Sequence, residues 1–446
     1  MGSRILQAAV DAEKNLPNAE KAFFIADLTQ IYKQFERWNR CLPNVEPFYA
    51  VKCNPDPYVV RLLAALGTGF DCASLQEIRH VMQVGVHPSR VIFANPCKSI
   101  SFIKHAAAAG VDMMTFDNTD EIYKIARVHP GAKLVVRILT DDSKSLCRLG
   151  LKFGAPLDTV PGLLSIARSL NLDVIGVSFH VGSGSYDTNA FAGAVMRARA
   201  AFDMGAEAGY SFKLLDVGGG FESTTFEPTA GVLARALETF FPFAHKEGIR
   251  IIAEPGRYFV SSAFSLAANV IARRVKHVDA ADRPLEMEGS VTSTTEDQPS
   301  VMYYINDGVY GAFNCILFDH QKVAPYPLTI AHCPVPPLIA AGATVESPGG
   351  EVMKPISGET VLASVWGPTC DSIDCVCPLT SLPMDLAVGD WLGFDHMGAY
   401  TLCAASTFNG FDVSEVHYTT GDSPVGAAVR AALSIYNEKI EDCDTT

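Results

Sequence analysis

The sequence lacks features that are typical of several common classes of protein. Its twelve cysteines are scattered, without the repeated spacing of a disulfide framework or a zinc site. Cys375 and Cys377 are the closest pair, and no second pair matches them. An excess of positive charge is also missing, because the net charge of -14 repels nucleic acid and anionic membranes. We therefore expect a protein of a reducing compartment, with no metal site, that attracts a small cation.

Long apolar segments are missing as well. The most apolar late stretch, Cys333–Ala343, is too short and too rich in proline to span a bilayer. Asp11, Glu13 and Lys14 interrupt the N-terminal segment, which argues against a secretory signal. With 446 residues, 48% of them apolar and 19% charged, the chain can build a large folded core. These features predict a cytoplasmic protein.

Short runs of β-forming residues alternate with amphipathic segments through the first half of the chain. Apolar residues recur at helical spacing in Tyr58–Leu66, Leu75–Val84, Ile100–Ala109 and Phe191–Ala208. Eight alternations predict a (β/α)8 barrel. The predicted strands are Phe48–Lys52, Gly69–Ala73, Val91–Asn95, Met113–Phe116, Leu134–Ile138, Val174–His180, Leu214–Val217 and Ile251–Glu254.

The pattern changes after Arg257 to longer β-like runs with turns between them. These runs are Phe264–Val275, Met302–Ile305, Val361–Val365 and Trp391–Phe394. The fold class is therefore α/β plus all-β, a TIM-like barrel with a second β-sandwich-like domain.

The change of pattern also suggests domain boundaries. We expect residues 1–27 to join the β domain, residues 28–265 to form the barrel and residues 266–446 to form the C-terminal β domain. The polar stretch Asp279–Ser300 and the Pro-, Ala- and Gly-rich stretch Thr329–Gly358 are expected to be mobile.

The carboxyl ends of the predicted barrel strands carry polar residues, and this is where such barrels place their catalytic sites. Lys52 would bring an amine to the barrel opening, where a desolvated lysine can bond covalently to a carbonyl group. An exposed lysine at a strand end is the alternative. The full polar set at these ends is Lys52, Asp71, Asn95, Asp117, Arg137, His180, Gly218, Gly219, Gly220 and Glu254.

The glycine triplet 218–220 follows a predicted strand, where bare backbone amides can surround a phosphate. A glycine triplet can also be a simple turn. Glu254 closes the last strand three residues before Arg257, and an acid that faces a pyridine nitrogen keeps the ring protonated as an electron sink. A local ion pair between these two residues is the alternative. His180 could stack on a planar cofactor or be an ordinary core histidine.

Seven motifs resemble the eukaryotic ornithine decarboxylase family, a group of pyridoxal-phosphate-dependent enzymes. They occur in order between about Phe23 and about Phe411. The motifs are PFYAVKCN at 47–54, GFDCAS at 69–74, SFHVGSG at 178–184, LDVGGGF at 215–221, EPGRY at 254–258, NDGVYG at 306–311 and WGPTCD at 366–371.

The resemblance implies roles for residues of the barrel. Lys52 would carry the pyridoxal 5'-phosphate, Glu254 would pair with its ring nitrogen and His180 would stack on its ring. Asp71 and Arg148 would support the cofactor lysine and the loop around it. The phosphate would lie among Ser183, Gly218, Gly219, Gly220, Arg257 and Tyr400.

The resemblance also implies a homodimer with shared active sites. Cys370 would donate a proton in the partner subunit's site, and Asp371, with Asp319 and Tyr310, would bind the distal ammonium of the substrate. The implied reaction converts ornithine to putrescine, and the implied partners include an antizyme-like regulator. Family members usually have Pro-Gly where this chain has Glu222 and Ser223, and its segment from Asp319 to Cys370 is longer than theirs.

Three other functions stay open at this stage. Decarboxylation of lysine or another basic amino acid is one, because a methylene distinguishes substrates by only about 1 to 3 kcal/mol. Diaminopimelate decarboxylation fits this sequence less well, since diaminopimelate decarboxylases typically carry glutamate where this chain has Asp371. A non-catalytic, antizyme-inhibitor-like protein is the third, although such relatives lose chemical residues that this chain keeps.

Overall fold

The computed structural model describes residues 6, 7, 9, 10, 20–185, 187, 189–275, 298–335 and 360–443. The chain forms two compact units. The barrel unit comprises residues 28–261 and 420–446, and the β unit comprises residues 1–27 and 262–419.

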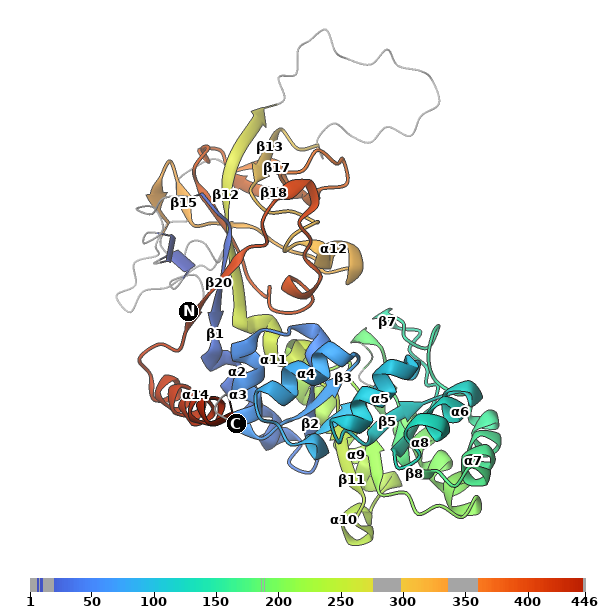
Figure 1. The fold of residues 1–446 in the computed structure, drawn as a ribbon. Helices are drawn as coiled ribbons and strands as arrows, with labels where there is room; N and C mark the ends of the chain where they lie inside the picture. The colour runs from blue at the N-terminus through green and yellow to red at the C-terminus, as the bar shows by residue number, and fades with distance from the viewer. Residues whose placement is uncertain are drawn as a thin grey trace, which may run out of the picture. The chain divides into compact units, whose positions relative to one another are not determined.

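The barrel unit contains eight parallel strands that close on themselves, as the sequence predicts (Figure 1). They follow the chain round the barrel until β11 pairs with β2. The first strand ends two residues earlier than predicted, so Lys52 lies in a single 3-10 turn, Val51–Cys53. The strands are β2 (Glu46–Ala50), β3 (Gly69–Cys72), β4 (Val91–Phe93), β5 (Met113–Phe116), β6 (Lys133–Arg137), β8 (Asp173–Ser178), β10 (Leu214–Asp216) and β11 (Arg250–Ala253).

Apolar side chains from six different strands pack on one another in the barrel. Residues spread around a closed sheet can meet in this way only across its interior. The barrel is therefore a filled core, and its chemistry is confined to the ends of the strands. The six residues are Phe48, Ile92, Met113, Val135, Leu214 and Ile252.

Capping residues fix where the first helices begin. Asp56, Ser74, Ser99 and Asn118 each accept a hydrogen bond from a backbone amide in the first turn of the helix that follows. The helices of this unit are α2 (Leu28–Cys41), α3 (Pro57–Leu66), α4 (Leu75–Gln83), α5 (Ile100–Ala108), α6 (Thr119–Val128), α7 (Val160–Ser169), α8 (Ala190–Glu207), α9 (Phe226–Phe240), α10 (Ala244–Glu247), α11 (Arg257–Val260) and α14 (Pro424–Cys443).

Helix α14 corrects one of the expected boundaries. The sequence analysis assigned residues 266–446 to the β domain, whereas α14 belongs to the barrel unit and packs on α2 and α3 (Figure 1). Val429 of this helix is fully buried, which supplies the apolar contact. Among the described residues, no helix has both the length and the apolar character needed to cross a membrane.

The β unit is organised by one long strand, β12 (Phe264–Val275). Its first half pairs with β1 (Phe23–Asp27) and β19 (Trp391–Phe394), and its second half pairs with β13 (Val301–Ile305). A register shift between Val270 and Ala272 separates the two halves. One strand thus takes part in two sheet regions.

The remaining strands of the β unit extend these two regions. β17 (Thr360–Trp366) pairs with β13 and with β18 (Cys375–Pro383), while β20 (Glu415–Thr419) pairs with β1. The sequence analysis did not predict β18 or β20, because polar and proline residues interrupt their apolar patterns. The short elements are β14 (Tyr326–Pro327), β15 (Thr329–Ile330), β16 (Cys333–Pro334) and α12 (Asn314–Phe318).

The two stretches expected to be mobile lie largely outside the described residues, which leave out 276–297 and 336–359. Residues 329–335 are described, and they include the antiparallel pair β15 and β16. This part of the second stretch is therefore ordered by strand pairing.

Two glycines provide a test of barrel packing. A Cβ atom at Gly176 in β8 would lie 2.0 Å from the Leu214 carbonyl oxygen, whereas one at Gly162 in α7 meets nothing within 4 Å. Gly176→Ala should therefore lower the free energy of unfolding by about 1 to 3 kcal/mol or more. Gly162→Ala should raise it by up to about 1 kcal/mol. Urea unfolding measures both changes, and equal effects would contradict this account of the packing.

Candidate active site

Lys52 and Asp71 form an ion pair at the carboxyl ends of β2 and β3. The Lys52 Nζ lies 2.5 Å from Asp71 Oδ2. The lysine side chain is 41% exposed and the aspartate side chain 1% exposed. The other oxygen of Asp71, Oδ1, is buried and meets no hydrogen-bond donor among the described residues. The pair therefore holds an accessible amine over a carboxylate that can accept a further bond.

The glycine loop after β10 tolerates no side chain. Gly218 and Gly220 have φ values of +66° and +100°, a backbone region that favours glycine. A Cβ at Gly219 would lie 2.7 Å from the His180 Nε2 and 2.8 Å from the Glu254 carbonyl oxygen. Bare backbone thus lies directly against His180 and the end of β11.

His180 is held with its ring beside this loop. Its Nδ1 accepts a hydrogen bond of 2.9 Å from the Gly182 amide, and its carbonyl accepts one of 3.0 Å from the Thr140 hydroxyl. Burial lowers the pKa of His180 well below its ordinary value, and the positive charges of Arg137 and Lys52 lower it further. The ring is therefore neutral at physiological pH, which suits stacking on a planar group.

Glu254 and Asp216 place two acids side by side at the ends of β11 and β10. The Glu254 amide donates to the Gly218 carbonyl at 2.6 Å, and the Gly218 amide donates to Asp216 Oδ1 at 2.9 Å. Burial raises the pKa of Glu254 well above its ordinary value, with the charges of Asp216 and Asp71 adding to the effect. Burial likewise raises the pKa of Asp216 to about 7.

The sequence analysis missed Asp216 as a site residue. A signal was present, because this carboxylate interrupts an otherwise apolar run, Leu214–Val217, that is buried throughout. A buried acid at the end of a barrel strand is costly unless it has a partner or a function.

Arg257 completes a possible anion-binding site beside the glycine loop. Its Nη2 lies 3.5 Å from the Ser183 hydroxyl. Its Nε forms an ion pair of 3.0 Å with Glu222 Oε1. Glu222 was noted in the sequence only as a departure from the family, and here it orients the guanidinium. Bare amides, a hydroxyl and a guanidinium are donors that suit a phosphate.

Asn95 and Asp117, also predicted at strand ends, have structural contacts instead. The Asn95 side chain bonds the Ala73 carbonyl and the Cys97 amide. Asp117 accepts bonds from Asn118 and from the Gly154 amide. The polar residues at the strand ends therefore form two sets. One set makes up the candidate active site, and the other, Asn95 and Asp117, joins neighbouring loops.

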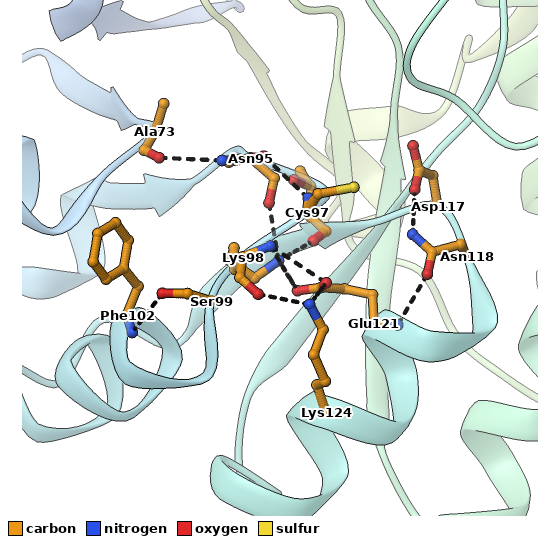
Figure 2. Close-up of polar contacts among 11 residues, drawn as sticks. Ala73, Asn95, Cys97, Lys98, Ser99, Phe102, Asp117, Asn118, Glu121 and Lys124 are labelled. Carbon is orange, nitrogen blue, oxygen red and sulfur yellow. Dashed lines mark hydrogen bonds and ion pairs between the residues drawn. The ribbon is translucent and has the colours of Figure 1, made fainter.

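A buried charged network supports this second set (Figure 2). The Lys98 Nζ lies 3.0 Å from Glu121 Oε1 and donates to the carbonyls of Asn95 and Thr115. The Lys124 Nζ lies 2.6 Å from Glu121 Oε2. The side chains of Lys98 and Glu121 are almost completely buried, so each is the partner that makes burial of the other tolerable.

Cys370 and Asp371 lie in the β unit in a loop that contacts Tyr310. The Tyr310 hydroxyl donates to Asp371 Oδ2 at 2.5 Å, and its ring stacks on Phe408 with centroids 4.2 Å apart. The hydrogen bond from Tyr310 lowers the pKa of Asp371, which is therefore ionised at neutral pH. The Cys370 thiol is exposed.

Two buried acids hold these loops. Asp374 accepts bonds from the amides of Val309 and Thr369 and from the Thr369 hydroxyl, which ties the Tyr310 loop to the Cys370 loop. Asp307 accepts bonds from two amides of its own loop and from the Ser414 hydroxyl. Burial raises the pKa of Asp307 to about 6.

The other expected site residues fall in both units. Arg148 is exposed after the short strand β7 (Ser145–Cys147) of the barrel unit. Asp319 is buried at the end of α12, and Tyr400 follows β19 with a φ of +56°, both in the β unit. The structure brings together Lys52, Asp71, His180, the glycine loop and Glu254 within the barrel unit, and Tyr310 with Asp371 within the β unit.

Comparison with known families identifies this arrangement. Residues 28–261, more than half of the chain, match the pyridoxal-binding domain of the pyridoxal-dependent decarboxylases. The chain belongs to this family. Its barrel is a pyridoxal-binding domain, and the enzyme is a decarboxylase that uses pyridoxal phosphate.

Individual relatives of the decarboxylase agree along nearly the whole chain. Ornithine decarboxylase of Schizosaccharomyces pombe is 48% identical over 94% of this chain and 87% of its own. Antizyme inhibitor 2 of Xenopus laevis is also 48% identical, over 93% and 85%. The crystal structure of a Paramecium bursaria Chlorella virus arginine decarboxylase, bound to agmatine, has a TM-score of 0.80 at 32% identity and covers 94% of this chain and 100% of its own.

The residues of the decarboxylase fit pyridoxal phosphate. The loop at 218–220 packs at Gly220 against the Gly182 carbonyl, which precedes Ser183 in the chain, and Arg257 reaches the Ser183 hydroxyl, so bare backbone, a hydroxyl and a guanidinium are available to a phosphate. Lys52 offers an accessible amine and Glu254 a buried carboxyl. When bound, the pyridoxal ring accepts the electron pair that the substrate releases as carbon dioxide leaves.

The buried network of Figure 2 gives a test of barrel support. Glu121→Gln leaves the buried Lys98 ammonium without its counter-charge, so the free energy of unfolding of the decarboxylase should fall by about 3 to 5 kcal/mol. Lys124→Ala is the matched control, because the ion pair between Glu121 and Lys98 remains in this variant. It should lower the free energy of unfolding by only about 1.5 kcal/mol. Chemical denaturation compares them, and a larger loss in the control would contradict the central place of the Lys98 and Glu121 pair.

Proposed function

We propose that the enzyme decarboxylates L-ornithine to putrescine in the cytoplasm, as a step of polyamine synthesis. The observation that carries the proposal is Lys52 held by Asp71 in the same barrel as the buried carboxyl of Glu254. The high identity to a fungal ornithine decarboxylase supports the choice of substrate.

Each barrel residue has a proposed role in holding the cofactor. Lys52 would bond covalently to the pyridoxal aldehyde, and Asp71 would orient its amine through their 2.5 Å contact. Glu254 would pair with the ring nitrogen, and the neutral His180 ring would stack on the cofactor ring. Arg148 supports the loop around Lys52.

The phosphate has a separate set of proposed partners. Gly219 and Gly220 supply backbone amides, Gly218 shapes the same loop while its own amide is bonded to Asp216, and Ser183, Arg257 and Tyr400 supply side-chain donors. The support for the first five is their proximity within the barrel unit. The support for Tyr400 is the family resemblance.

Substrate binding is assigned to the β unit. An ionised Asp371, with Tyr310 and Asp319, would bind the distal ammonium of ornithine through a charge-assisted hydrogen bond. The exposed thiol of Cys370 would donate the proton that replaces the departing carboxylate. Asp374 would keep these residues together through its contacts with both loops.

The proposal includes a homodimer in which Cys370 and Asp371 of one subunit complete the partner's barrel site. The support is the family resemblance, together with the location of the two sets of residues in separate units. An antizyme-like regulator is proposed because an antizyme inhibitor is among the close relatives.

Two alternatives have specific support. The similarity to an arginine decarboxylase structure supports the alternative that the substrate is a basic amino acid other than ornithine. The similarity to an antizyme inhibitor suggests a regulator that does not decarboxylate. The presence of Lys52, Asp71, His180, Glu254 and Cys370 favours an active enzyme over that second alternative.

Product analysis tests the function directly. With ornithine, lysine, arginine and diaminopimelate offered together, putrescine should be the main product. Lys52→Ala should remove nearly all turnover and the cofactor absorbance that borohydride fixes to the chain, while the protein stays folded, because only the covalent anchor is lost. Cadaverine or agmatine as the main product would reject ornithine. A fixed cofactor in the variant would place the anchor at another lysine.

Complementation tests the shared site. Homodimers of Lys52→Ala and of Cys370→Ala should each be inactive or nearly so, and subunit exchange should make half of the dimers mixed. Each mixed dimer has one site with both defects and one with neither, so about a quarter of wild-type activity should return. If exchange is demonstrated and no activity returns, both residues serve a site within one subunit.

A further inference from the structure

Asp216 is a buried acid for which the proposed reaction has no use. Its side chain is completely inaccessible at the end of β10. The Gly218 amide donates to its Oδ1 at 2.9 Å. Its Oδ2 meets no donor among the described residues. The anchored Oδ1 fixes the carboxyl plane, so the remaining oxygen is the one available to a neighbouring group.

That neighbour is Glu254 on the adjacent strand. β10 and β11 pair with Asp216 opposite Ile252, and the Glu254 amide donates to the Gly218 carbonyl in the same loop. This strand pairing and this loop bond bring the Asp216 and Glu254 carboxyls close together, and the charge of Asp216 raises the pKa of Glu254. Two carboxylates have no proton to donate, so the two side chains can bond to each other only when one of the acids is protonated.

The surrounding charges favour a single proton on the pair. Asp71 on β3 adds a third acid, and Lys52 and Arg137 are the positive groups that act on these carboxyls. His180, also against the loop, is neutral. Two adjacent buried carboxylates would repel each other at close range, as in other acid pairs that share one proton.

We propose that Asp216 is a positioning residue for Glu254, and that the pair shares one proton, which lies on Asp216 when Glu254 faces the cofactor. Asp216 then donates a hydrogen bond to the Glu254 carboxylate while its own Oδ1 stays on the Gly218 amide. Glu254 is left with its charge and one oxygen directed at the ring nitrogen. This inference rests on the proposed role of Glu254.

Two variants distinguish the effect of the proton on Asp216 from the effect of the side chain's volume. Asp216→Asn keeps an oxygen for the Gly218 amide and offers an N–H donor to Glu254, which imitates a protonated aspartate. Asp216→Ala removes both contacts. A hydrogen bond to a charged group contributes about 1.5 to 3 kcal/mol, so turnover of the alanine variant should be lower than that of the asparagine variant by about tenfold to a hundredfold.

The decisive measurement uses the cofactor-free protein. Infrared spectroscopy with isotope-labelled glutamate follows the protonated carboxyl band of Glu254, and Glu254→Gln assigns this band by deleting it. Asp216→Asn removes a neighbouring negative charge and donates to the carboxylate, so the band should disappear at a lower pH than in wild type. An unchanged midpoint, or turnover as low in Asp216→Asn as in Asp216→Ala, would overturn the proposal.

Stability against pH provides a second measurement without cofactor. The pKa of Asp216 is raised from about 4 in an unfolded chain to about 7 in the folded protein, so between these values the folded state binds the extra proton. The free energy of unfolding should therefore fall as pH rises through this window. Asp216→Asn should flatten this slope, and an equally steep slope in the variant would overturn the proposal.

These measurements also separate this inference from the proposed function. A band shift and a flattened slope in a protein that releases no putrescine would support the acid pair and reject ornithine decarboxylation. Ornithine turnover with an unchanged band midpoint would support ornithine decarboxylation and reject the acid pair.

Discussion

Closure of eight parallel strands is the constraint on which the rest of this structure depends. Because the strands run in one direction, their carboxyl ends meet at one opening. Lys52, His180 and Glu254 are separated by many residues in the chain, yet all three occupy loops at that opening. The interior is filled by apolar side chains from six strands, so polar chemistry is possible only at the ends.

The treatment of buried charge distinguishes structural from chemical residues at these ends. Glu121 is buried with two lysines around it, and its oxygens are both used. Asp71 and Asp216 are buried with one oxygen each that meets no donor among the described residues. Burying a polar group without a partner is costly, so such oxygens mark places where a ligand or a shared proton supplies the missing bond.

The β unit holds partly buried residues of two loops in a fixed arrangement. Asp371 and Tyr310 lie in two loops far apart in the chain, and a hydrogen bond joins them. The loops keep this arrangement because Asp374 bonds amides in both, and because Gly308 and Gly367 leave space for its carboxylate. The exposed thiol of Cys370 and the carboxylate of Asp371 are thus presented by a loop whose backbone is anchored.

The sequence by itself determined the class of fold and most of the candidate site. Local apolar periodicity located all eight barrel strands, and seven ordered motifs indicated the family. It could not place α14, because an apolar helix face does not reveal which unit it covers, and it missed β18 and β20, whose alternation is broken. Only the tertiary structure assigned Asn95 and Asp117 to structural contacts and placed Asp216 on the strand next to that of Glu254. Those distinctions depend on which buried polar atoms find partners, and partners that lie on different strands meet only when the barrel closes.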